Sequence, residues 1–538
     1  MPTPGNEPQN ATASTWAPLR RPVFRALWLV GLLSMTGSWM HDAAASWLMT
    51  SLTDSPAMVA LVQTATALPT FFLALAAGAL ADIVDRRRLL ILGQGWMMLV
   101  AITLGVLTIL GLTNAWILLI LTFCMGIGLA LSLPAISALL PDLVPRNELL
   151  PAITLNGVAG NATRAIGPAL GGTLIGIVGP GLIFIINGLT YIGIIATLIR
   201  SPLKRDKESP LPSERFIGAV KVGVRYARQS STLKKALLRG SLFFCGGVAV
   251  LALLPVFVRE TLGGGPQTFG LMLTGYGAGA VLTAFVLPSL ARIANRDQIL
   301  IGGQTLFAAS LVWLSYSTSI STALPATFLA GFAWLITLAT YQVAVQMSLP
   351  TWVRARGLAI FLMTVMGFMA LGSALWGLVA RELSIPLSMI IAAIFIVTGT
   401  LFTMRLSLVG DEDDLSPVST WSDPGVALPL EGHSGPVEVL VEYEIPPENR
   451  DKFVRQMRAI RRIRQRNGAY SWSLHEDINQ PGVFIETFMD DSWHDHLRRR
   501  LRLTAADRAA QDSVNALQVV PGEPKVRQLL AEELPRSS

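Results

Sequence analysis

Three ionisable residues lie inside otherwise apolar stretches in the first 200 residues of the chain: His41, Asp42 and Arg164. A charge near the centre of a bilayer costs at least about 2.5–3.5 kcal/mol on insertion scales, so such a residue is normally paired or functional. Asp42 follows Arg25 by 17 residues, and Arg164 follows Glu148 by 16. At a rise of about 1.5 Å per residue, both side chains are expected about 25 Å along their helices, at a shared depth.

A carboxylate and a guanidinium at one depth support two interpretations. In the first, Asp42 is a protonatable coupling site, and Arg164 favours its charged form or engages an anionic substrate. A substrate drawn to Arg164 would then release Asp42 to take up a proton. In the second, the two residues form a static buried ion pair that fixes helix packing. His41 points elsewhere on its helix and is expected to have a packing role or a role at the rim of the site.

The segments that carry these residues belong to a chain that is apolar over most of its length. Of its 538 residues, 52% are hydrophobic and only 14% are charged, against roughly 25% charged in soluble proteins. Stretches of about 20 apolar residues predict membrane-spanning helices. We expect two groups of six, at 24–51, 55–81, 89–110, 115–138, 149–176 and 180–199, then at 236–258, 266–291, 298–318, 322–346, 355–380 and 385–408.

The loops between these helices differ in their content of Lys and Arg, which predicts the orientation of the chain. Alternate loops are basic, and the remaining loops carry only Arg259 and Arg381, each followed by an acid. The positive-inside rule therefore places both termini in the cytoplasm and the chain in the cytoplasmic membrane. The same rule accounts for the net charge of +7, so no nucleic-acid partner is expected.

The composition also limits the chemistry of the chain. Cys124 and Cys245 both fall in apolar segments, so neither a structural disulfide nor a thiolate metal site is expected. No Gly-Lys-Ser/Thr phosphate loop occurs, which argues against ATP-driven transport by this chain alone. Three glycines at 275, 277 and 279 lie inside an apolar helix with no preceding strand, so they do not indicate a dinucleotide site. No cofactor and no metal are expected.

Six parts follow from these patterns. The first is a polar N-terminus at 1–22, and the second is a six-helix half at 23–200. A cytoplasmic linker with an amphipathic helix follows at 201–235, and a second six-helix half at 236–408. After a linker at 409–435, a soluble domain at 436–533 shows the order strand, helix, two strands, helix, strand, which predicts a ferredoxin-like α+β fold. Its histidines (His475, His494 and His496) lack metal-site spacing, and Arg498 begins a basic run.

Uncharged polar residues in the apolar segments extend a candidate substrate pathway. Asn161 lies three residues before Arg164 and therefore shares its helix face. The second half has almost no charge inside its helices, which suggests a more aromatic binding wall there, formed by Trp313, Trp334, Tyr341 and Trp376; each of these is individually more typical of packing or lipid contact. The candidate substrate-binding residues are Gln63, Asn156, Asn161, Tyr276, Gln342 and Gln346.

Two motifs give the chain a resemblance to the major facilitator superfamily. The loop after the second helix supplies Gly78, Asp82, Arg86 and Arg87 of the signature Gly-x-Leu-Ala-Asp-x-x-Gly-Arg-Lys, with Asp85 in place of the usual second glycine. The fifth helix carries Gly167-Pro168-Ala-Leu-Gly171-Gly172, similar to the antiporter signature, with Thr163 in place of its leading glycine. Within the superfamily the chain looks most like the transmembrane secretion effector group, which includes the enterobactin exporter.

The resemblance implies a fold and a function. It implies two six-helix halves that rock around a central site, with the first and fifth helices close enough for Asp42 and Arg164 to pair. The loop at Asp82 and Arg86 would lock cytoplasmic helix ends, and the glycines at 167, 171 and 172 with Pro168 would give close helix packing and a bend. It implies a secondary active exporter, proton-driven, of a siderophore, drug or similar amphipathic small molecule.

Two alternatives from other classes remain open. The chain could be a non-transporting membrane sensor that signals through its C-terminal domain. That domain is similar to small dimeric α+β barrels related to antibiotic-biosynthesis monooxygenases, so it could instead be an oxygenase, although no acid–base constellation is evident in its sequence. We expect no enzymatic activity. The expected partners are a small-molecule substrate, protons, the lipid bilayer and a second copy of the chain bound through the C-terminal domain.

Overall fold

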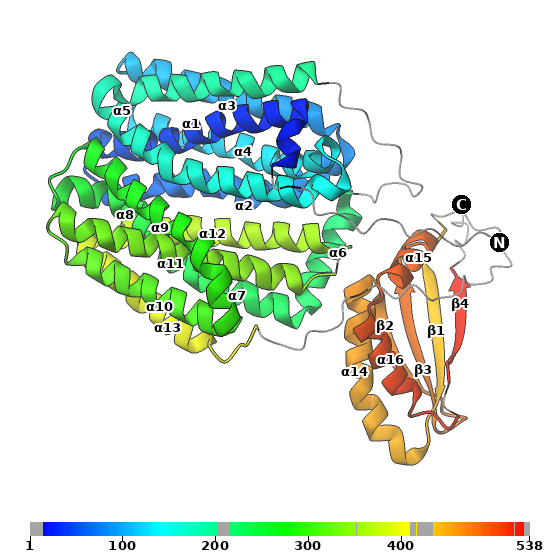
Figure 1. Ribbon diagram of the computed structural model, residues 1–538. Helices are drawn as coiled ribbons and strands as arrows, with labels where there is room; N and C mark the ends of the chain where they lie inside the picture. The colour runs from blue at the N-terminus through cyan, green and yellow to red at the C-terminus, as the bar shows by residue number, and fades with distance from the viewer. Residues whose placement is uncertain are drawn as a thin grey trace, which may run out of the picture. The chain divides into compact units, whose positions relative to one another are not determined.

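The structure, a computed structural model, describes residues 14, 16–201, 216–350, 352–408, 416, 434–520 and 522–531. The chain divides into two compact units. We call the first the helical unit; its described residues are those up to 201, 236–343 and 361–408. We call the second the C-terminal unit; it contains 216–235, 344–360 and the described residues after 408. Both are drawn in Figure 1.

Helices make up the helical unit. In the first half of the chain they are α1 (Pro22–Leu52), α2 (Pro56–Ile83), α3 (Arg86–Ile109), α4 (Ala115–Leu143) and α5 (Leu149–Arg200). In the second half they are α7 (Ser231–Gly247), α8 (Ala249–Val256), α9 (Pro266–Ile293), α10 (Arg296–Ser315), α11 (Ile320–Met347), α12 (Arg354–Glu382) and α13 (Ile385–Thr403). Among the described residues, eleven helical segments are long and apolar enough to cross a membrane.

One of these segments, α5, covers two of the expected helices. It has 52 residues, which would extend about 78 Å as one straight helix, more than twice the thickness of a hydrocarbon core of about 30 Å. Gly179 interrupts it with φ 79°, a left-handed conformation that glycine adopts without steric cost, and Pro180 follows. The chain turns back there (Figure 1), at the boundary expected between 149–176 and 180–199.

Side-chain caps set several helix starts. The side chain of Asn114 accepts from the backbone N–H of Ile117 at 2.9 Å, and Asn295 and Gln298 form a capping box at the start of α10. Asp85 caps α3 by accepting from the N–H of Arg88 at 2.9 Å. A carboxylate at a helix N-terminus is favourable for both hydrogen bonding and charge. The departure at Asp85 from the superfamily signature is therefore accommodated by a helix cap.

The expected helix at 236–258 begins earlier, at Ser231, and its apolar span continues to Thr261. A one-residue turn at Val248 separates α7 from α8, and a π-helical turn (Phe257–Thr261) ends the span. The adjacent Gly246 and Gly247 weaken helix propensity at this point. Gly247 lies against the ring of Trp334, where a β-carbon would be 2.9 Å from the indole. Gly247 therefore packs against this large ring directly beside the turn at Val248.

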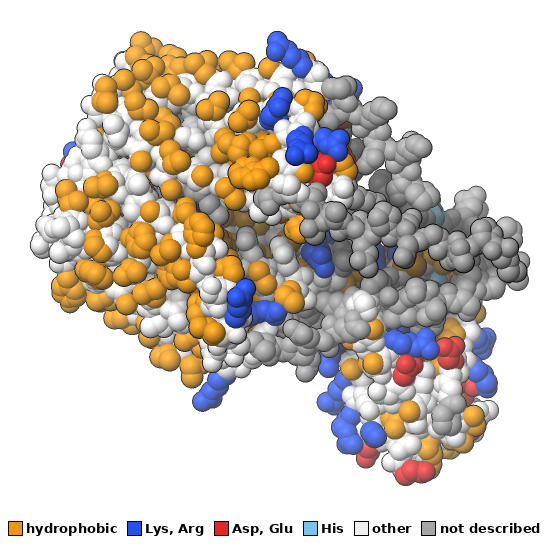
Figure 2. All heavy atoms as spheres, in the orientation of Figure 1, with side chains coloured by type: hydrophobic (Ala, Val, Ile, Leu, Met, Phe, Trp, Pro, Cys, Tyr) orange, Lys and Arg blue, Asp and Glu red, His pale blue; other side chains and the backbone are white. Residues whose placement is uncertain are grey.

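The outside of the helical unit is largely apolar. Figure 2 shows hydrophobic side chains over most of its visible face, while charged side chains are dense on the C-terminal domain. Exposed hydrophobic residues on the helices include Leu33, Leu92, Phe285 and Phe402. Such an exposed apolar surface is typical of helices that contact lipid.

One charge in the second half is buried, although the sequence pattern suggested almost none. The side chain of Arg239 on α7 is only 1% exposed and forms an ion pair with Asp297 at the start of α10. Arg239 also donates to the Leu406 carbonyl at 3.0 Å, and Asp297 accepts from Ser407. The pair thus joins α7 and α10 to the segment that follows α13.

The C-terminal domain, residues 434–531, is a four-stranded antiparallel sheet with helices. Its strands lie in the order β2-β3-β1-β4. The elements in chain order are β1 (Val437–Glu444), α14 (Arg450–Asn467), β2 (Tyr470–Glu476), β3 (Val483–Asp490), α15 (Trp493–Leu501), α16 (Ala505–Asn515) and β4 (Lys525–Leu530). The linker at 201–235 contains α6 (Phe216–Gln229), whose side chains the structure describes from Gly223 onward.

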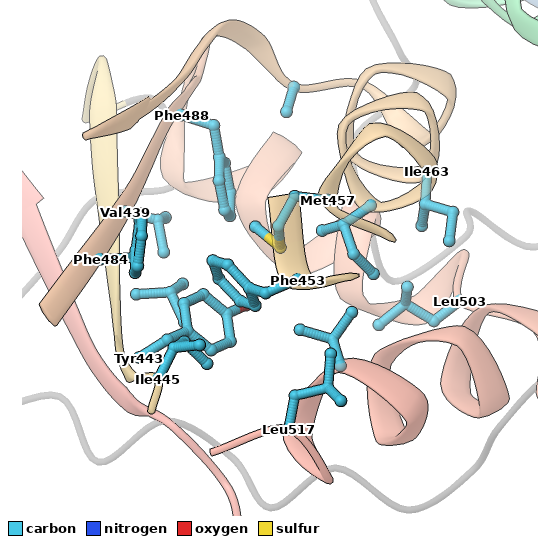
Figure 3. Packing of buried hydrophobic residues seen from close by; sticks show 14 of the residues in the cluster. Val439, Tyr443, Ile445, Phe453, Met457, Ile463, Phe484, Phe488, Leu503 and Leu517 are labelled. Atoms are coloured by element: carbon cyan, nitrogen blue, oxygen red, sulfur yellow. The ribbon is translucent and has the colours of Figure 1, made fainter. Parts of the chain in front are cut away.

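The core of this domain lies between one face of the sheet and the helices (Figure 3). Alternate residues of β1 are buried, including Val439 and Tyr443, and they pack against Phe453 and Met457 of α14. The second helix expected in this domain, near 493–503, corresponds to α15, and a further helix that was not expected, α16, follows it. Helix α16 begins with a capping box between Thr504 and Asp507, which is a helix start signal already present in the sequence.

Candidate functional site

The two halves of the helical unit touch through bare backbone. Gly172 of α5 faces Gly270 of α9, and a β-carbon at Gly270 would lie 2.6 Å from the Gly172 Cα. A β-carbon at Gly277 would lie 2.6 Å from the Cα of Ala165. Real β-carbons do not approach this closely, so only glycine permits the contact. The glycines of α9 thus serve helix packing.

A second pair of helices joins the halves in the same way. On α12, a β-carbon at Gly377 would lie 3.0 Å from the Cα of Ala57 on α2, and Thr64 donates to the Ala370 carbonyl at 3.0 Å. Arg259, from the second half, donates to the carbonyl of Thr50 near the end of α1. These contacts lie toward the end of the helical unit where α1 ends and α2 begins.

Gly167 and Gly171 face the first helix instead. A β-carbon at Gly167 would be 3.1 Å from the Thr36 carbonyl, and one at Gly171 would be 3.1 Å from the Met40 Cα. The short motif on α5 therefore packs against α1 with two glycines and against α9 with Gly172. Pro168 lies within α5 between these positions.

Arg164 lies where α1, α5 and α9 meet. Its guanidinium carbon is 5.4 Å from the centroid of the Trp39 ring on α1. Tyr276 of α9 lies within electrostatic range of the same guanidinium. The Nε of Arg164 and the hydroxyl of Tyr276 are both buried, and neither has a hydrogen-bond partner among the described residues. Two residues predicted separately, one in each half, are thus brought together.

The expected ion pair between Asp42 and Arg164 is not formed in this structure, which describes both residues. Arg164 instead stacks on Trp39, three residues before Asp42. The depths were counted from flanking charges, whereas α1 begins at Pro22 and α5 at Leu149. Counted from these starts, Asp42 lies 20 residues in and Arg164 lies 15, so they differ by about 7.5 Å in depth.

Asp42 lies near a polar cluster that the sequence analysis missed. Ser38 of α1 and Tyr191 of α5 are 3.2 Å apart between their hydroxyls, and Asn187 donates to the Tyr191 hydroxyl at 3.3 Å. Asp42 is half-buried and within electrostatic range of Tyr191. Uncharged polar residues scattered in apolar helices give little signal individually. The spacing of four between Asn187 and Tyr191, which places them on one helix face, was the available clue.

His41 lies at the edge of this cluster. It is 2% exposed and its ring lies 4.6 Å from that of Phe184. Neither ring nitrogen has a hydrogen-bond partner among the described residues. The packing role expected for His41 agrees with this ring contact.

The basic residues that begin α3 connect helix ends within the first half. Arg86 forms an ion pair with Asp142 at the end of α4, at 3.2 Å. Arg87 donates to the carbonyl of Ile199 near the end of α5, at 2.7 Å. The surroundings of Gly78 and of the Asp82 side chain, the other two residues of the predicted gating motif, are not among those that the structure describes.

The remaining predicted substrate-binding residues are dispersed. Gln63 on α2 and Asn156 on α5 are half-buried, while Gln342 and Gln346 on α11 are exposed. The side chain of Asn161 lies outside the described residues. Among the residues that the structure describes, Arg164 and Tyr276 come together while these four glutamine and asparagine side chains lie elsewhere on α2, α5 and α11, so the geometry unites only part of the predicted set.

The aromatic residues expected to line a binding wall pack within the second half. The ring of Trp334 contacts Phe243, Phe244 and Phe307, with centroids 5.4–5.9 Å apart. The indole of Trp376 donates to the Cys245 carbonyl at 2.7 Å. Tyr341 is fully buried, and Trp313 is 44% exposed on the surface of the unit. Three of these four aromatic residues therefore pack inside the second half, and Trp313 lies on its surface, as is typical of individual aromatic residues in such helices.

The C-terminal domain contains a buried polar cluster on β3. Glu486 is fully buried and accepts hydrogen bonds from Arg464, Tyr443 and Trp472 at 2.8–3.3 Å. Burial of the Tyr443 hydroxyl raises the pKa of this phenol. Buried charges are tolerated when they are paired and hydrogen-bonded, as here. The cluster is not evident from the sequence, because Glu486 stands among mostly hydrophobic residues along its strand.

A second buried group joins Asp490 to His496 and Arg499. The Nδ1 of His496 is 2.9 Å from Asp490, and Arg499 donates to the same carboxylate at 3.0 Å. Burial lowers the pKa of His496 below its ordinary value of about 6.5. Burial opposes ionisation of Asp490, but Arg499 and His496 together hold its pKa below the usual range. At neutral pH the histidine is neutral and the aspartate is ionised.

This arrangement predicts that the C-terminal domain loses stability in mild acid. The unfolded chain binds a proton on His496 near pH 6.5, whereas the folded domain resists it, so stability falls as the pH drops through that value. The contribution of Asp490 is lost only at lower pH. We expect faster hydrogen exchange of β3 at about pH 5.5 than at about pH 7.5, after correction for intrinsic rates. His496→Gln should flatten this pH dependence, and His475→Gln, at an exposed position on β2, should not.

Comparisons with known proteins identify the family. The family model of the transmembrane secretion effectors matches residues 13–536, nearly the whole chain. The chain belongs to this family of the major facilitator superfamily. It is a multi-pass membrane transporter, and the family and its relatives are transporters, not enzymes. The predictions of the superfamily and of a non-enzymatic transporter are thus confirmed.

Curated relatives and solved structures agree with this assignment. The chain is 25% identical over 352 residues to the staphyloferrin A transporter of Staphylococcus aureus, covering 65% of this chain and 87% of the relative. It is 24% identical over 307 residues to macrolide efflux protein A of Streptococcus pyogenes, covering 56% and 73%. The crystal structure of a bacterial homologue of the human lysosomal transporter Spinster, inward-facing and unoccupied, matches with TM-score 0.59 and 14% identity, covering 72% of this chain and 97% of that one.

Proposed function

We propose that the transmembrane secretion effector described here is a proton-coupled exporter of an anionic, amphipathic small molecule, such as a siderophore, working by alternating access. The observation that carries this proposal is Arg164: its Nε is buried without a hydrogen-bond partner among the described residues, where α1, α5 and α9 meet. A guanidinium in this setting can bind a carboxylate of the cargo. Trp39 and Tyr276 supply aromatic surface for its apolar part.

The relatives support the cargo class and direction. One relative is named as a transporter of staphyloferrin A and another as a macrolide efflux protein. In the proposal Asp42 exchanges the proton. Hydrogen bonds with Ser38 and Asn187 hold the hydroxyl of Tyr191, which lies within electrostatic range of the Asp42 carboxylate. Because Asp42 does not pair with Arg164, the guanidinium group of Arg164 can bind the cargo instead.

The proposal includes the orientation and the state of the transporter. We count α5 as two membrane-spanning helices separated at Gly179, which gives twelve spans with both termini cytoplasmic. In that orientation, the glycine contacts between α5 and α9 and between α2 and α12 lie toward the outer end. The site would then open toward the cytoplasm, ready to accept cargo for export.

We also propose that the C-terminal domain is a ferredoxin-like α+β sandwich that pairs two chains. Its sheet order and antiparallel pairing fit that fold. The sheet face opposite the helices carries half-exposed apolar residues, including Leu440, Ile485 and Met489, which a second copy could cover. The other proposed partners are protons, the cargo and the bilayer.

The proposal predicts that Arg164→Gln selectively weakens binding of anionic cargo. A charge-assisted hydrogen bond contributes about 1.5–3 kcal/mol, so we expect at least about ten-fold weaker binding of a carboxylate-bearing siderophore. Binding of a neutral amphipathic compound should change little. Purified protein in proteoliposomes would be assayed for cargo binding and for cargo-triggered pH change. Equal losses for charged and neutral compounds would contradict a cargo-binding role for Arg164.

A further inference from the structure

The C-terminal unit contains a contact that the transport proposal does not use. One side of it is a docking face on the C-terminal domain, formed by the ends of α14 and α15: Gln465, Arg466, Gly468 and Arg502. The other side is helix α6 together with the turn between α11 and α12, represented by Ser348 and Trp352. All of these residues belong to the C-terminal unit.

A buried tyrosine connects helix α6 to the α11–α12 turn. Tyr226 is 1% exposed and donates its hydroxyl hydrogen to the Ser348 carbonyl at 3.2 Å. Its ring meets the Trp352 ring edge-on, with centroids 5.7 Å apart and planes at 85°. This is the arrangement that aromatic quadrupoles favour. Close by, a β-carbon at Gly223 would lie 3.2 Å from the Arg356 side chain, so α6 also packs closely on the start of α12.

Two arginines of the docking face cover this aromatic pair. The guanidinium carbon of Arg466 is 5.8 Å from the Tyr226 centroid, and that of Arg502 is 4.7 Å from the Trp352 centroid. Both arginines are held by the domain itself. Arg466 forms an ion pair with Asp507, and Arg502 donates to the Asn467 carbonyl at 2.9 Å. The cations are therefore positioned before they meet the rings, which lowers the entropy cost of docking.

Two hydrogen bonds extend the contact along α6. Arg225 donates to the carbonyl of Gly468 at the C-terminus of α14, where the helix dipole is negative. Gln229 donates to the side chain of Gln465 at 3.3 Å. Helix α6 and the end of α14 are both basic, so their charges would repel across a plain surface. Carbonyls and aromatic rings, rather than carboxylates, accept the arginines and allow two basic surfaces to meet.

We infer that the C-terminal domain is an intramolecular clamp that binds α6 and the α11–α12 turn through this docking face. The clamp has a defined occupant, two segments of the same chain, and it does not depend on which cargo is carried. Because α11 and α12 continue beyond the turn as long helices, a ligand or second copy that binds the domain would act on the ends of these helices.

Disulfide trapping in the full-length chain tests the clamp. Gln229→Cys and Gln465→Cys would be introduced together with Cys124→Ala and Cys245→Ala, and a protease site would be placed within residues 418–430. After oxidation in native membranes and cleavage, we expect the two fragments to remain joined at the mass of one chain. A control pair, Gln229→Cys with Arg458→Cys, places the second thiol two turns away on α14, about 10 Å along the helix, and should not cross-link.

Variants on each side of the contact test its chemistry. Arg466→Gln with Arg502→Gln should lower the cross-linked fraction at early times by at least about five-fold, because two cation–π contacts are lost. Tyr226→Ala with Trp352→Ala should do the same without altering the domain, and hydrogen exchange of β3 would verify that the domain remains folded. Arg462→Gln, at an exposed position on α14, should have no effect. The clamp would be overturned if no cross-link formed, or if the cross-linked product had the mass of two chains. It would also be overturned if Tyr226→Ala with Trp352→Ala left the cross-linked fraction unchanged.

Discussion

Replacing Gly172 by alanine is expected to reduce transport at least about ten-fold. The new methyl group would lie 2.8 Å from the Pro266 carbonyl and would also meet the backbone of Gly270. Backbone atoms cannot rotate away as a side chain can, so α5 and α9 must separate. Overpacking of this kind costs about 1–3 kcal/mol, and each 1.4 kcal/mol changes the ratio of two conformations about ten-fold.

The matched control is Gly157→Ala on the same helix. A β-carbon at Gly157 would have no other atom within 4 Å, so the added methyl should not disturb packing and should slightly favour the helix. Transport would be measured in proteoliposomes. Opening would be followed by the reaction of a membrane-impermeant thiol reagent with Ala57→Cys, a buried position beside Gly377. Gly172→Ala should speed this reaction. Equal behaviour of the two glycine variants would show that the α5–α9 contact does not limit transport.

Asp42→Asn is expected to abolish cargo-driven proton movement while leaving cargo binding largely intact. Asparagine matches aspartate in shape but cannot exchange a proton. Asp42 lies apart from Arg164, so its replacement should not remove the charge that is proposed to hold the cargo. A siderophore gradient across proteoliposome membranes should therefore produce a pH change with the wild type and none above the empty-vesicle background with the variant.

Asp54→Asn provides the control, because Asp54 is exposed in the turn between α1 and α2. Membrane abundance and thermal stability should be measured for both variants to separate coupling from folding. Normal proton flux in Asp42→Asn would place coupling elsewhere. A static packing role would instead appear as loss of stability together with loss of both binding and flux.

The sequence predicted most helices because lipid demands long apolar segments with satisfied backbones. The ends of α2, α9 and α12 lie within a few residues of the expected positions. Glycine-rich α5 was expected to pack closely, and its contacts with α1 and α9 are close. The partner helix of each glycine did not follow from the sequence, because neighbouring positions on a helix face different directions and the contact depends on tertiary arrangement.

The candidate site was harder to predict than the fold. The prediction of an ion pair between Asp42 and Arg164 depended on where each helix begins. An error of about one helical turn in either start shifts a side chain by about 5.4 Å, which is enough to prevent a direct ion pair. Arg164 stacks on Trp39 because the Trp39 ring lies at the same depth in the helical unit as the guanidinium group. The Asn187–Tyr191 pair and buried Glu486 escaped notice for another reason. A single polar residue in an apolar pattern becomes informative only when its partners, distant in sequence, are known.

The glycine contact between α5 and α9 has a consequence for how easily the two halves part. Side chains that interlock must lose rotamer freedom when they pack, and long ones lose up to about 2 kcal/mol each. Gly172, Gly270 and Gly277 have no rotamers to lose or regain. Separation and closure of this surface therefore change the order of the backbone and lipid far more than the order of side chains. The two halves can therefore separate and close in each transport cycle without reordering side-chain rotamers at this contact.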